Sequence, residues 1–237
     1  MPTDNDTVNI DNIIARVKKL QALGDASKNH NLNEVKAATK IAEQLISQYR
    51  LSAAQLESEG HASSEPFKDE ACMIIGRRLA YIESLLTGLC KHFSGSYFVQ
   101  SGRNSDNKGE CLYFLTAKES DWTVIHYFIN YLFSEIDRIS RAECKGMGLS
   151  ESNSFRMGMA NGICSLFAEL RETTKSDVNN CTALVFLDKR GEEAKREMYK
   201  KHDLKKASGI SGGTNYDARS RGYERGRQVS INSALNK

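Results

Sequence analysis

The stretch CLYFLTAKESDWTVIHYFINYLFSEIDRISRAE, residues 111–143, changes its hydrophobic period partway along and so predicts a strand followed by a long helix. Residues 111–115 are a short apolar and aromatic run, which is typical of a strand. Over residues 122–139 the apolar side chains instead recur every three or four positions, the period of an α-helix. The sequence TAKE at residues 116–119 has the spacing of a capping box, so we expect a helix over Lys118–Glu143.

The segment before this stretch supplies a partner for the strand. Tyr97–Val99 is a second short aromatic and β-branched run, and the polar residues Ser101–Gly109 separate it from residues 111–115. This arrangement predicts an antiparallel hairpin. Upstream, an apolar stripe of helical period predicts a helix over Asp69–Phe93, which Ser94-Gly95 would end.

The segment after residue 143 alternates further helices with one short apolar run. We expect a helix over Ser154–Thr174, a third strand over Thr182–Leu187, a helix over Gly191–Lys201 and a last helix over Tyr216–Leu235. The predicted fold is therefore α+β and helix-dominated. Its small antiparallel sheet would be covered on one face by the three long helices that begin near residues 69, 118 and 154.

The amino-terminal region predicts a separate helical hairpin. Ile10–Leu23 and Glu34–Tyr49 both carry amphipathic helical patterns, and Gly24 with a polar stretch lies between them. Gly60–Pro66 is polar and reads as a linker. We therefore expect an N-terminal hairpin domain over residues 1–60 and an α+β domain over residues 67–237, whose segment 189–227 is basic.

Composition excludes several classes of protein. The chain has 237 residues, 40% hydrophobic and 27% charged, and its longest apolar run, Ala183–Leu187, is far too short to span a bilayer. The first residues are polar and acidic and do not resemble a secretory leader, so a cytoplasmic location is expected. The six cysteines lie far apart in the sequence, and we interpret them as reduced thiols.

Small residues recur every four positions in two of the predicted helices, although glycine is unfavourable inside a helix. One stripe comprises Ser154, Gly158 and Gly162, and the other comprises Ala218, Gly222, Gly226 and Ser230. Such flat faces predict that the two helices pack closely against each other. The alternative is that the face admits a phosphate backbone or a partner chain.

Basic residues concentrate near the carboxyl end. Residues 189–227 contain twelve basic and six acidic side chains, a net charge of +6, whereas the whole chain carries +3. A basic segment of this kind indicates nonspecific binding of DNA or RNA through phosphates. The candidate nucleic-acid-binding residues are Lys189, Arg190, Lys195, Arg196, Lys200, Lys201, Lys205, Lys206, Arg219, Arg221, Arg225 and Arg227.

A second interpretation stays open, in which the basic residues belong to an ordinary solvated helix. Glu192 with Arg196, and Glu197 with Lys201, stand at i, i+4, as on a solvated helix. The chain would then act through protein surfaces, as an interaction module or an inhibitor of a host enzyme, without a nucleic-acid role.

Signs of catalysis are weak. The common nucleotide-binding and zinc-hydrolase motifs are missing, and no cofactor, metal ligand or catalytic residue is predicted. The third hypothesis is an enzyme built around Cys90, His92 and Cys111, provided that the fold brings these residues together.

Ile13–Leu23 and Glu34–Leu51 resemble the amino-terminal helical hairpin of DUF2786, an uncharacterised bacterial and phage family. Further similar segments are Leu79–Val99, Glu119-Ser120-Asp121, Ser154-Phe155-Arg156-Met157-Gly158 and Tyr216–Val229. Where relatives tend to carry Gly-Arg, this chain has Ala117-Lys118, so no role for that arginine is carried over. The resemblance implies a cytoplasmic accessory protein of a phage or mobile element and supplies no catalytic position.

Overall fold

The computed structural model describes residues 65–175, 178–205 and 208–229. Nearly all of them belong to one compact unit, Ser63–Arg227. The predicted N-terminal hairpin and Lys206 lie outside the described residues, and the proposed division into domains 1–60 and 67–237 stays a prediction.

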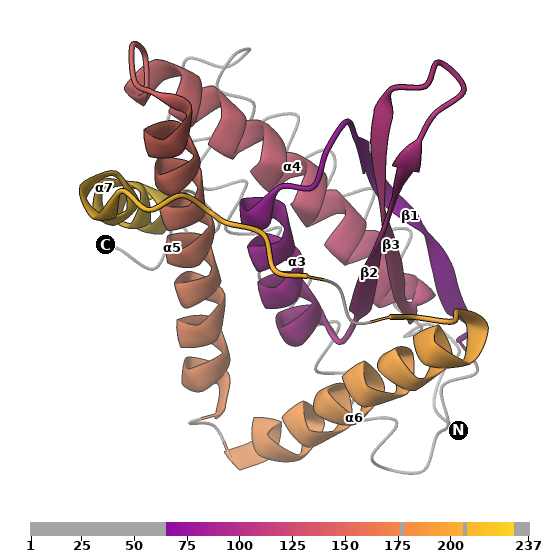
Figure 1. Cartoon of the computed structure of the whole chain (residues 1–237). Coiled ribbons are helices and arrows are strands. Elements are labelled where there is room, and N and C mark those ends of the chain that lie inside the picture. The colour runs from indigo at the N-terminus through magenta and orange to yellow at the C-terminus, as the bar shows by residue number, and fades with distance from the viewer. Residues whose placement is uncertain (1–64, 176–177, 206–207, 230–237) are drawn as a thin grey trace, which may run out of the picture. The chain divides into compact units, whose positions relative to one another are not determined.

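The described unit has a helix-dominated α+β fold, as the sequence predicts (Figure 1). Its three antiparallel strands lie in the order β1-β3-β2. The elements are β1 (Phe67–Ile75), α3 (Ala80–Phe93), β2 (Ser96–Arg103), β3 (Gly109–Lys118), α4 (Glu119–Glu143), α5 (Leu149–Lys175), α6 (Val178–Lys201) and α7 (Tyr216–Arg227).

The hairpin of β2 and β3 is confirmed, and its register assigns the two faces of the sheet. Successive side chains of a strand point to opposite faces. Tyr113 and Tyr97 belong to the face covered by α3, because the Tyr113 hydroxyl accepts the Leu79 N–H and the Tyr97 hydroxyl donates to the Glu83 carbonyl. We call this the inner face. The intervening side chains, Phe98 and Phe114 among them, then belong to the outer face.

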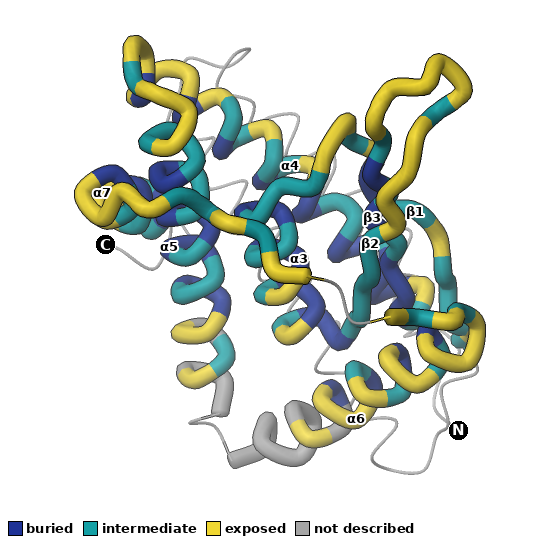
Figure 2. Tube along the Cα trace, in the orientation of Figure 1, coloured by how far each residue is buried: buried dark blue, intermediate teal, exposed yellow. Residues whose placement is uncertain are grey.

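The inner face is covered by α3 and α4, and the main core lies there. The fully buried side chains include Ile82, Leu85, Leu86 and Leu89 of α3 and Ile125, Ile129, Leu132 and Ile136 of α4. Figure 2 shows these helices buried where they meet each other and the sheet, whereas the tip of the β2–β3 hairpin is exposed. The apolar stripe predicted for residues 122–139 is therefore confirmed as a core-facing stripe.

The predicted helix over Asp69–Phe93 is wrong in its first half. Residues 67–75 form strand β1 and α3 begins at Ala80, with Leu79 extended. A bulge between Ala71 and Met73 interrupts the alternation, and Cys72 and Met73 are both buried. The bulge removes the two-residue period, so the apolar positions also fitted a helix.

The predicted strand over Thr182–Leu187 is also wrong, because these residues lie within α6. Buried side chains of α6 recur at Leu187, Arg190, Ala194 and Met198, a helical period. One of the four is an arginine, which conceals the stripe in the sequence. The third strand of the sheet is β1 instead.

Two further details differ from expectation. The Thr116 hydroxyl donates to Asp69 in the sheet, so the predicted capping box does not form. The Glu65 carboxylate instead accepts the Ser120 backbone N–H and hydroxyl at the start of α4. Helix α7 ends at Arg227, and the part of the predicted helix from residue 230 to Leu235 lies outside the described residues.

The third long helix does not cover the sheet as predicted. Helix α5 packs on α3 and on α7, whereas α6 packs along one end of the sheet and against β2 and β3 (Figure 1). Helix α6 therefore positions its cations beside the sheet, and α5 positions those of α7.

Candidate nucleic-acid interface

The small-residue stripes form the contact between α5 and α7. A methyl group at Gly158 would overlap the carbonyl oxygen of Arg219, and one at Gly222 would overlap that of Phe155. Gly162 and Gly226 lie equally close to the opposite backbone. The predicted close packing is confirmed. The alternative, a face left open for a phosphate backbone or a partner chain, is wrong because the opposite helix occupies it.

The arginines of α7 hold this helix in place. Arg221 lies 3.2 Å from Glu151, Arg225 lies 2.7 Å from Glu143, and Arg227 lies 2.5 Å from Glu169, measured between guanidinium nitrogen and carboxylate oxygen. The hydrogen bond from Arg227 lowers the pKa of Glu169. These carboxylates belong to α4 and α5, so the ion pairs reinforce the glycine contact. Arg219 is half-buried and makes no ion pair within the described residues.

One cation of α6 is removed from the surface altogether. The Arg190 side chain is 6% exposed, and its Nη1 lies 3.6 Å from Oδ2 of Asp121, whose side chain is 1% exposed. Asp121 belongs to the first turn of α4, where the helix dipole favours a carboxylate. This buried pair joins α6 to α4 and cannot contact nucleic acid.

The remaining cations of α6, and Lys205 beyond its end, are exposed, and only some of them are paired. Lys200 lies 2.8 Å from Glu197, and Lys201 lies 3.8 Å from Asp69. Four exposed cations make no ion pair within the described part of the chain. These four are Lys189, Lys195, Arg196 and Lys205.

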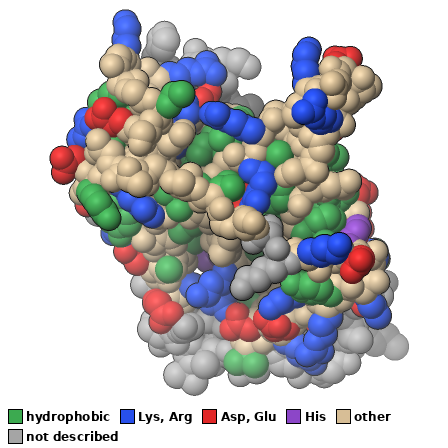
Figure 3. Space-filling view, in the orientation of Figure 1, with side chains coloured by type: hydrophobic (Ala, Val, Ile, Leu, Met, Phe, Trp, Pro, Cys, Tyr) green, Lys and Arg blue, Asp and Glu red, His purple; other side chains and the backbone are tan. Residues whose placement is uncertain are grey.

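The predicted cations therefore form two groups, which lie against different parts of the fold. The α7 group lies against α5, and the α6 group lies beside the sheet (Figure 1). In the second group, the cations toward the carboxyl end predominate over the neighbouring acids Glu197 and Asp203. We call this set the α6 basic end; it comprises Lys195, Arg196, Lys200, Lys201 and Lys205. Figure 3 shows Lys and Arg side chains around α6 with acidic side chains between them.

A carboxylate of the sheet anchors the last turn of α6. Oδ1 of Asp69 accepts the Thr116 hydroxyl at 2.9 Å, and its Oδ2 lies 2.8 Å from Nε2 of His202. The His202 ring centroid lies 4.4 Å from that of Phe98 on β2. No sequence pattern indicates this contact, because Asp69 and His202 are 133 positions apart. The contact sets where Lys201 meets the sheet.

The candidate enzyme residues occupy three different environments. Burial raises the pKa of the Cys90 thiol well above its ordinary value, which disfavours the thiolate that nucleophilic or metal chemistry needs. His92 packs against Phe93 and Phe167, and the Cys111 thiol contacts the Ser101 hydroxyl at 3.4 Å. Within the described residues, no group of three or more His, Cys, Asp or Glu side chains could hold a metal ion.

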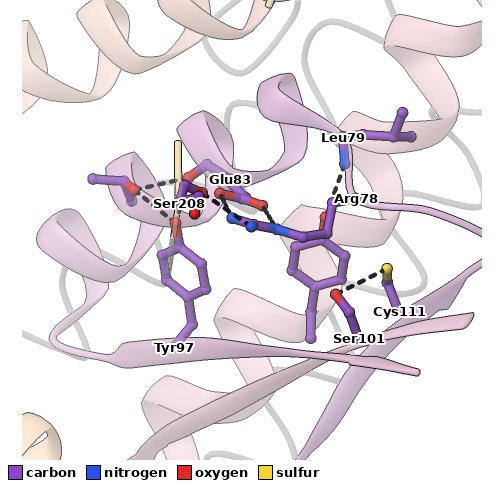
Figure 4. A network of polar contacts seen from close by, with 9 residues as sticks. Arg78, Leu79, Glu83, Tyr97, Ser101, Cys111 and Ser208 are labelled. Atoms are coloured by element: carbon purple, nitrogen blue, oxygen red, sulfur yellow. Dashed lines mark hydrogen bonds and ion pairs between the residues drawn. The ribbon is translucent and has the colours of Figure 1, made fainter. Parts of the chain in front are cut away.

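A polar network beside Cys111 ties the segment before α7 to α3 (Figure 4). Arg78 donates two hydrogen bonds to the Glu83 carboxylate, at 2.8 and 2.9 Å, and a third to the Ser208 carbonyl at 3.1 Å. The Tyr97 hydroxyl donates to the Glu83 carbonyl at 3.0 Å. These contacts join α3 to β2 and to the segment before α3, and join that segment to the one before α7, so we interpret the network as structural.

Buried thiols predict a loss of stability at alkaline pH. Burial raises the pKa of Cys72 to about 12 and that of Cys164 to about 11, from an ordinary value of about 9. Above pH 9 the unfolded thiols lose protons that the folded thiols keep, so the free energy of unfolding falls as pH rises. The fall approaches about 1.4 kcal/mol per pH unit for each thiol.

Urea denaturation at a series of pH values measures this fall. The Cys72→Ala/Cys164→Ala variant should show a shallower decline than the parent between pH 9 and pH 10, whereas the buried Tyr81 and Tyr113, whose pKa values are also raised, contribute equally in both proteins. Parallel declines in the two proteins would contradict the assignment.

The described residues form a helix-dominated α+β unit with a three-stranded antiparallel sheet. Residues 12–53 match the family described as "Protein of unknown function (DUF2786)", which confirms the resemblance over that segment. The four further similar segments lie beyond the match. No curated protein and no solved structure matches the chain. None of the described helices is long and apolar enough to cross a membrane.

Proposed function

We propose that the α6 basic end binds the phosphate backbone of nucleic acid without base specificity. The observation that carries the proposal is that Lys195, Arg196 and Lys205 are exposed and make no ion pair within the described residues. Lys200 and Lys201 add two further cations in the last turn of the same helix. Exposed cations of this kind release counterions when they neutralise phosphates, which supplies nonspecific affinity.

The helix dipole alone does not explain this cluster. Cations are favourable in the last turn of a helix, and the effect fades beyond that turn. It therefore accounts for Lys200 and Lys201, which lie in the last turn of α6. Lys195 and Arg196 lie more than a turn from the end, so their exposed charges suggest another use.

The proposal leaves out the arginines of α7. Binding phosphates with Arg221, Arg225 or Arg227 would require breaking ion pairs that hold α7 on α5. The resemblance to DUF2786 is the basis for placing the activity in a cytoplasmic process of a phage or mobile element.

The Lys195→Ala/Arg196→Ala variant tests the proposal. We expect it to bind labelled DNA and RNA about tenfold more weakly than the parent, because two phosphate contacts are lost. The slope of log affinity against log salt should also become shallower by about 2. Fluorescence anisotropy over a range of salt concentrations measures both quantities.

The matched control removes one lysine and one arginine elsewhere. Arg77 and Lys145 are exposed, make no ion pair within the described part of the chain, and lie outside α6. Arg77→Ala/Lys145→Ala should leave the affinity and the salt slope near those of the parent. Binding by the parent that does not respond to salt, or an equal loss in both variants, would refute the proposal.

The other half of α6 favours a second candidate function, contact with a protein partner. Its exposed face carries both signs of charge, from Asp188, Lys189 and Glu192, beside Val185, which is 62% exposed. Pull-down from a host lysate treated with nuclease tests this candidate. A partner retained by the parent and lost in a Val185→Asp variant supports it, whereas equal capture by both proteins contradicts it.

A further inference from the structure

The outer face of the sheet carries apolar side chains next to the α6 basic end. The register aligns Ala71, Phe114 and Phe98 in one row across the three strands, and Ile74, Leu112 and Gln100 in the next. These residues alternate with Tyr97, Tyr113 and the other side chains of the inner face, so they point away from α3. We call Ala71, Ile74, Phe98, Leu112 and Phe114 the outer-face platform.

The platform is aromatic where it meets α6 and more exposed farther away. The Phe98 and Phe114 rings are stacked, with centroids 4.9 Å apart and an angle of 4° between their planes. His202 extends this cluster, with its ring 4.4 Å from Phe98 and 6.1 Å from Phe114. Both phenylalanines are half-buried, Ile74 is 61% exposed and Gln100 is exposed.

The charges around the platform favour an anionic occupant. Asp69 lies on this face, but its carboxylate already contacts His202 at 2.8 Å and Lys201 at 3.8 Å. Glu110 is aligned with Gly102, beyond Gln100 and at the far end from α6. Near the aromatic cluster, the Lys201 side chain is 45% exposed, and His202 is followed by the exposed Asp203 and the exposed Lys205.

We propose that this platform stacks the bases of a single-stranded nucleic acid whose backbone runs along the α6 basic end. The proposal rests on the proposed function and specifies its ligand. Aromatic rings beside a positively charged groove or ridge bind single strands with little sequence preference, because every base has a π face. A duplex keeps its bases stacked on each other and offers the platform only its backbone.

The position of the platform explains why a nucleic acid fits better than an apolar peptide. The α6 basic end continues onto the platform through Lys201 and His202, both of which contact Asp69. Gln100 adds an exposed amide that can donate to and accept from a base edge. A second copy of this chain would instead bring the same cations against each other.

Substitution of Phe98 separates base stacking from backbone attachment. We expect Phe98→Leu to weaken binding of single-stranded DNA and RNA about tenfold and to leave binding of a duplex of the same sequence unchanged. Phe98→Tyr keeps an aromatic ring and should retain single-strand binding near that of the parent. Anisotropy titrations at one fixed salt concentration, on variants with unchanged circular dichroism, compare the three proteins.

A second measurement uses the unsubstituted chain. Photocrosslinking to single strands that contain bromouracil, followed by mass spectrometry, should place crosslinks on the peptides that contain Phe98 and Phe114. Crosslinks found only outside the sheet would overturn the proposal, even if Phe98→Leu failed to fold.

The outcomes distinguish this inference from the proposed function. If Lys195→Ala/Arg196→Ala weakens binding of single strands and duplex alike while Phe98→Leu weakens neither, the α6 basic end binds nucleic acid and the platform does not. If the parent binds no nucleic acid, both proposals fail. A parent dimer that Phe98→Leu converts to a monomer would identify a second copy as the occupant and would also overturn the inference.

Discussion

Gly222→Ala is expected to lower the free energy of unfolding by about 3 kcal/mol, the upper end of the usual cost of overpacking. The added methyl group would overlap the Phe155 carbonyl on α5, and a backbone atom cannot rotate away as a flexible side chain can. The overlap would force α7 away from α5 and stretch the ion pairs of Arg221 and Arg225. Urea denaturation measures the loss, and limited proteolysis reports whether α7 becomes accessible first.

Gly191→Ala is the matched control for a glycine inside a helix. A methyl group at Gly191 in α6 would lie 3.6 Å from the Ser94 Cα, an ordinary contact distance. The substitution should therefore leave stability unchanged or raise it by up to about 1 kcal/mol, through helix propensity. Equal destabilisation by Gly191→Ala and Gly222→Ala would show that the α5–α7 contact is not special.

Arg190→Met is expected to lower the free energy of unfolding by about 3–5 kcal/mol. The substitution removes the guanidinium that faces the buried Asp121 and leaves a carboxylate in the interior without its ion-pair partner. Trp122 is adjacent to Asp121 and is the chain's single tryptophan, so its fluorescence reports directly on this region during urea denaturation.

Replacing both members of the pair separates its charge from its packing. Two apolar side chains of similar volume often substitute for a buried ion pair at little cost, so Asp121→Leu added to Arg190→Met should recover most of the stability. Lys189→Ala, on the exposed neighbour, should change stability by less than about 0.5 kcal/mol. If Arg190→Met is as mild as Lys189→Ala, the pair does not hold α6 to α4.

Elements with a single clear period could be predicted from the sequence. The apolar stripe of α4 places its core residues, and the polar turn between two aromatic runs identifies the β2–β3 hairpin. The glycine stripes of α5 and α7 likewise predict their contact, because a helix keeps glycines at this spacing only for close approach.

The prediction failed where a local feature concealed the period. The bulge at Ala71 and Met73 turned the alternation of β1 into a pattern that also suited a helix. In α6 the buried Arg190 interrupted the apolar stripe, and the preceding apolar run resembled a strand. Short apolar runs form either structure, and their tertiary surroundings decide between them.

The same division holds for the candidate site. The sequence by itself determined how many cations the carboxyl-terminal segment carries, and that two helices have faces flat enough to meet. Only the tertiary structure decided which of those cations are paired, because all the ion-pair partners except Glu197 lie outside the segment: these are Asp69, Asp121, Glu143, Glu151 and Glu169. An ion pair requires two side chains within a few ångströms of each other, and folding alone brings residues so distant along the chain to that separation.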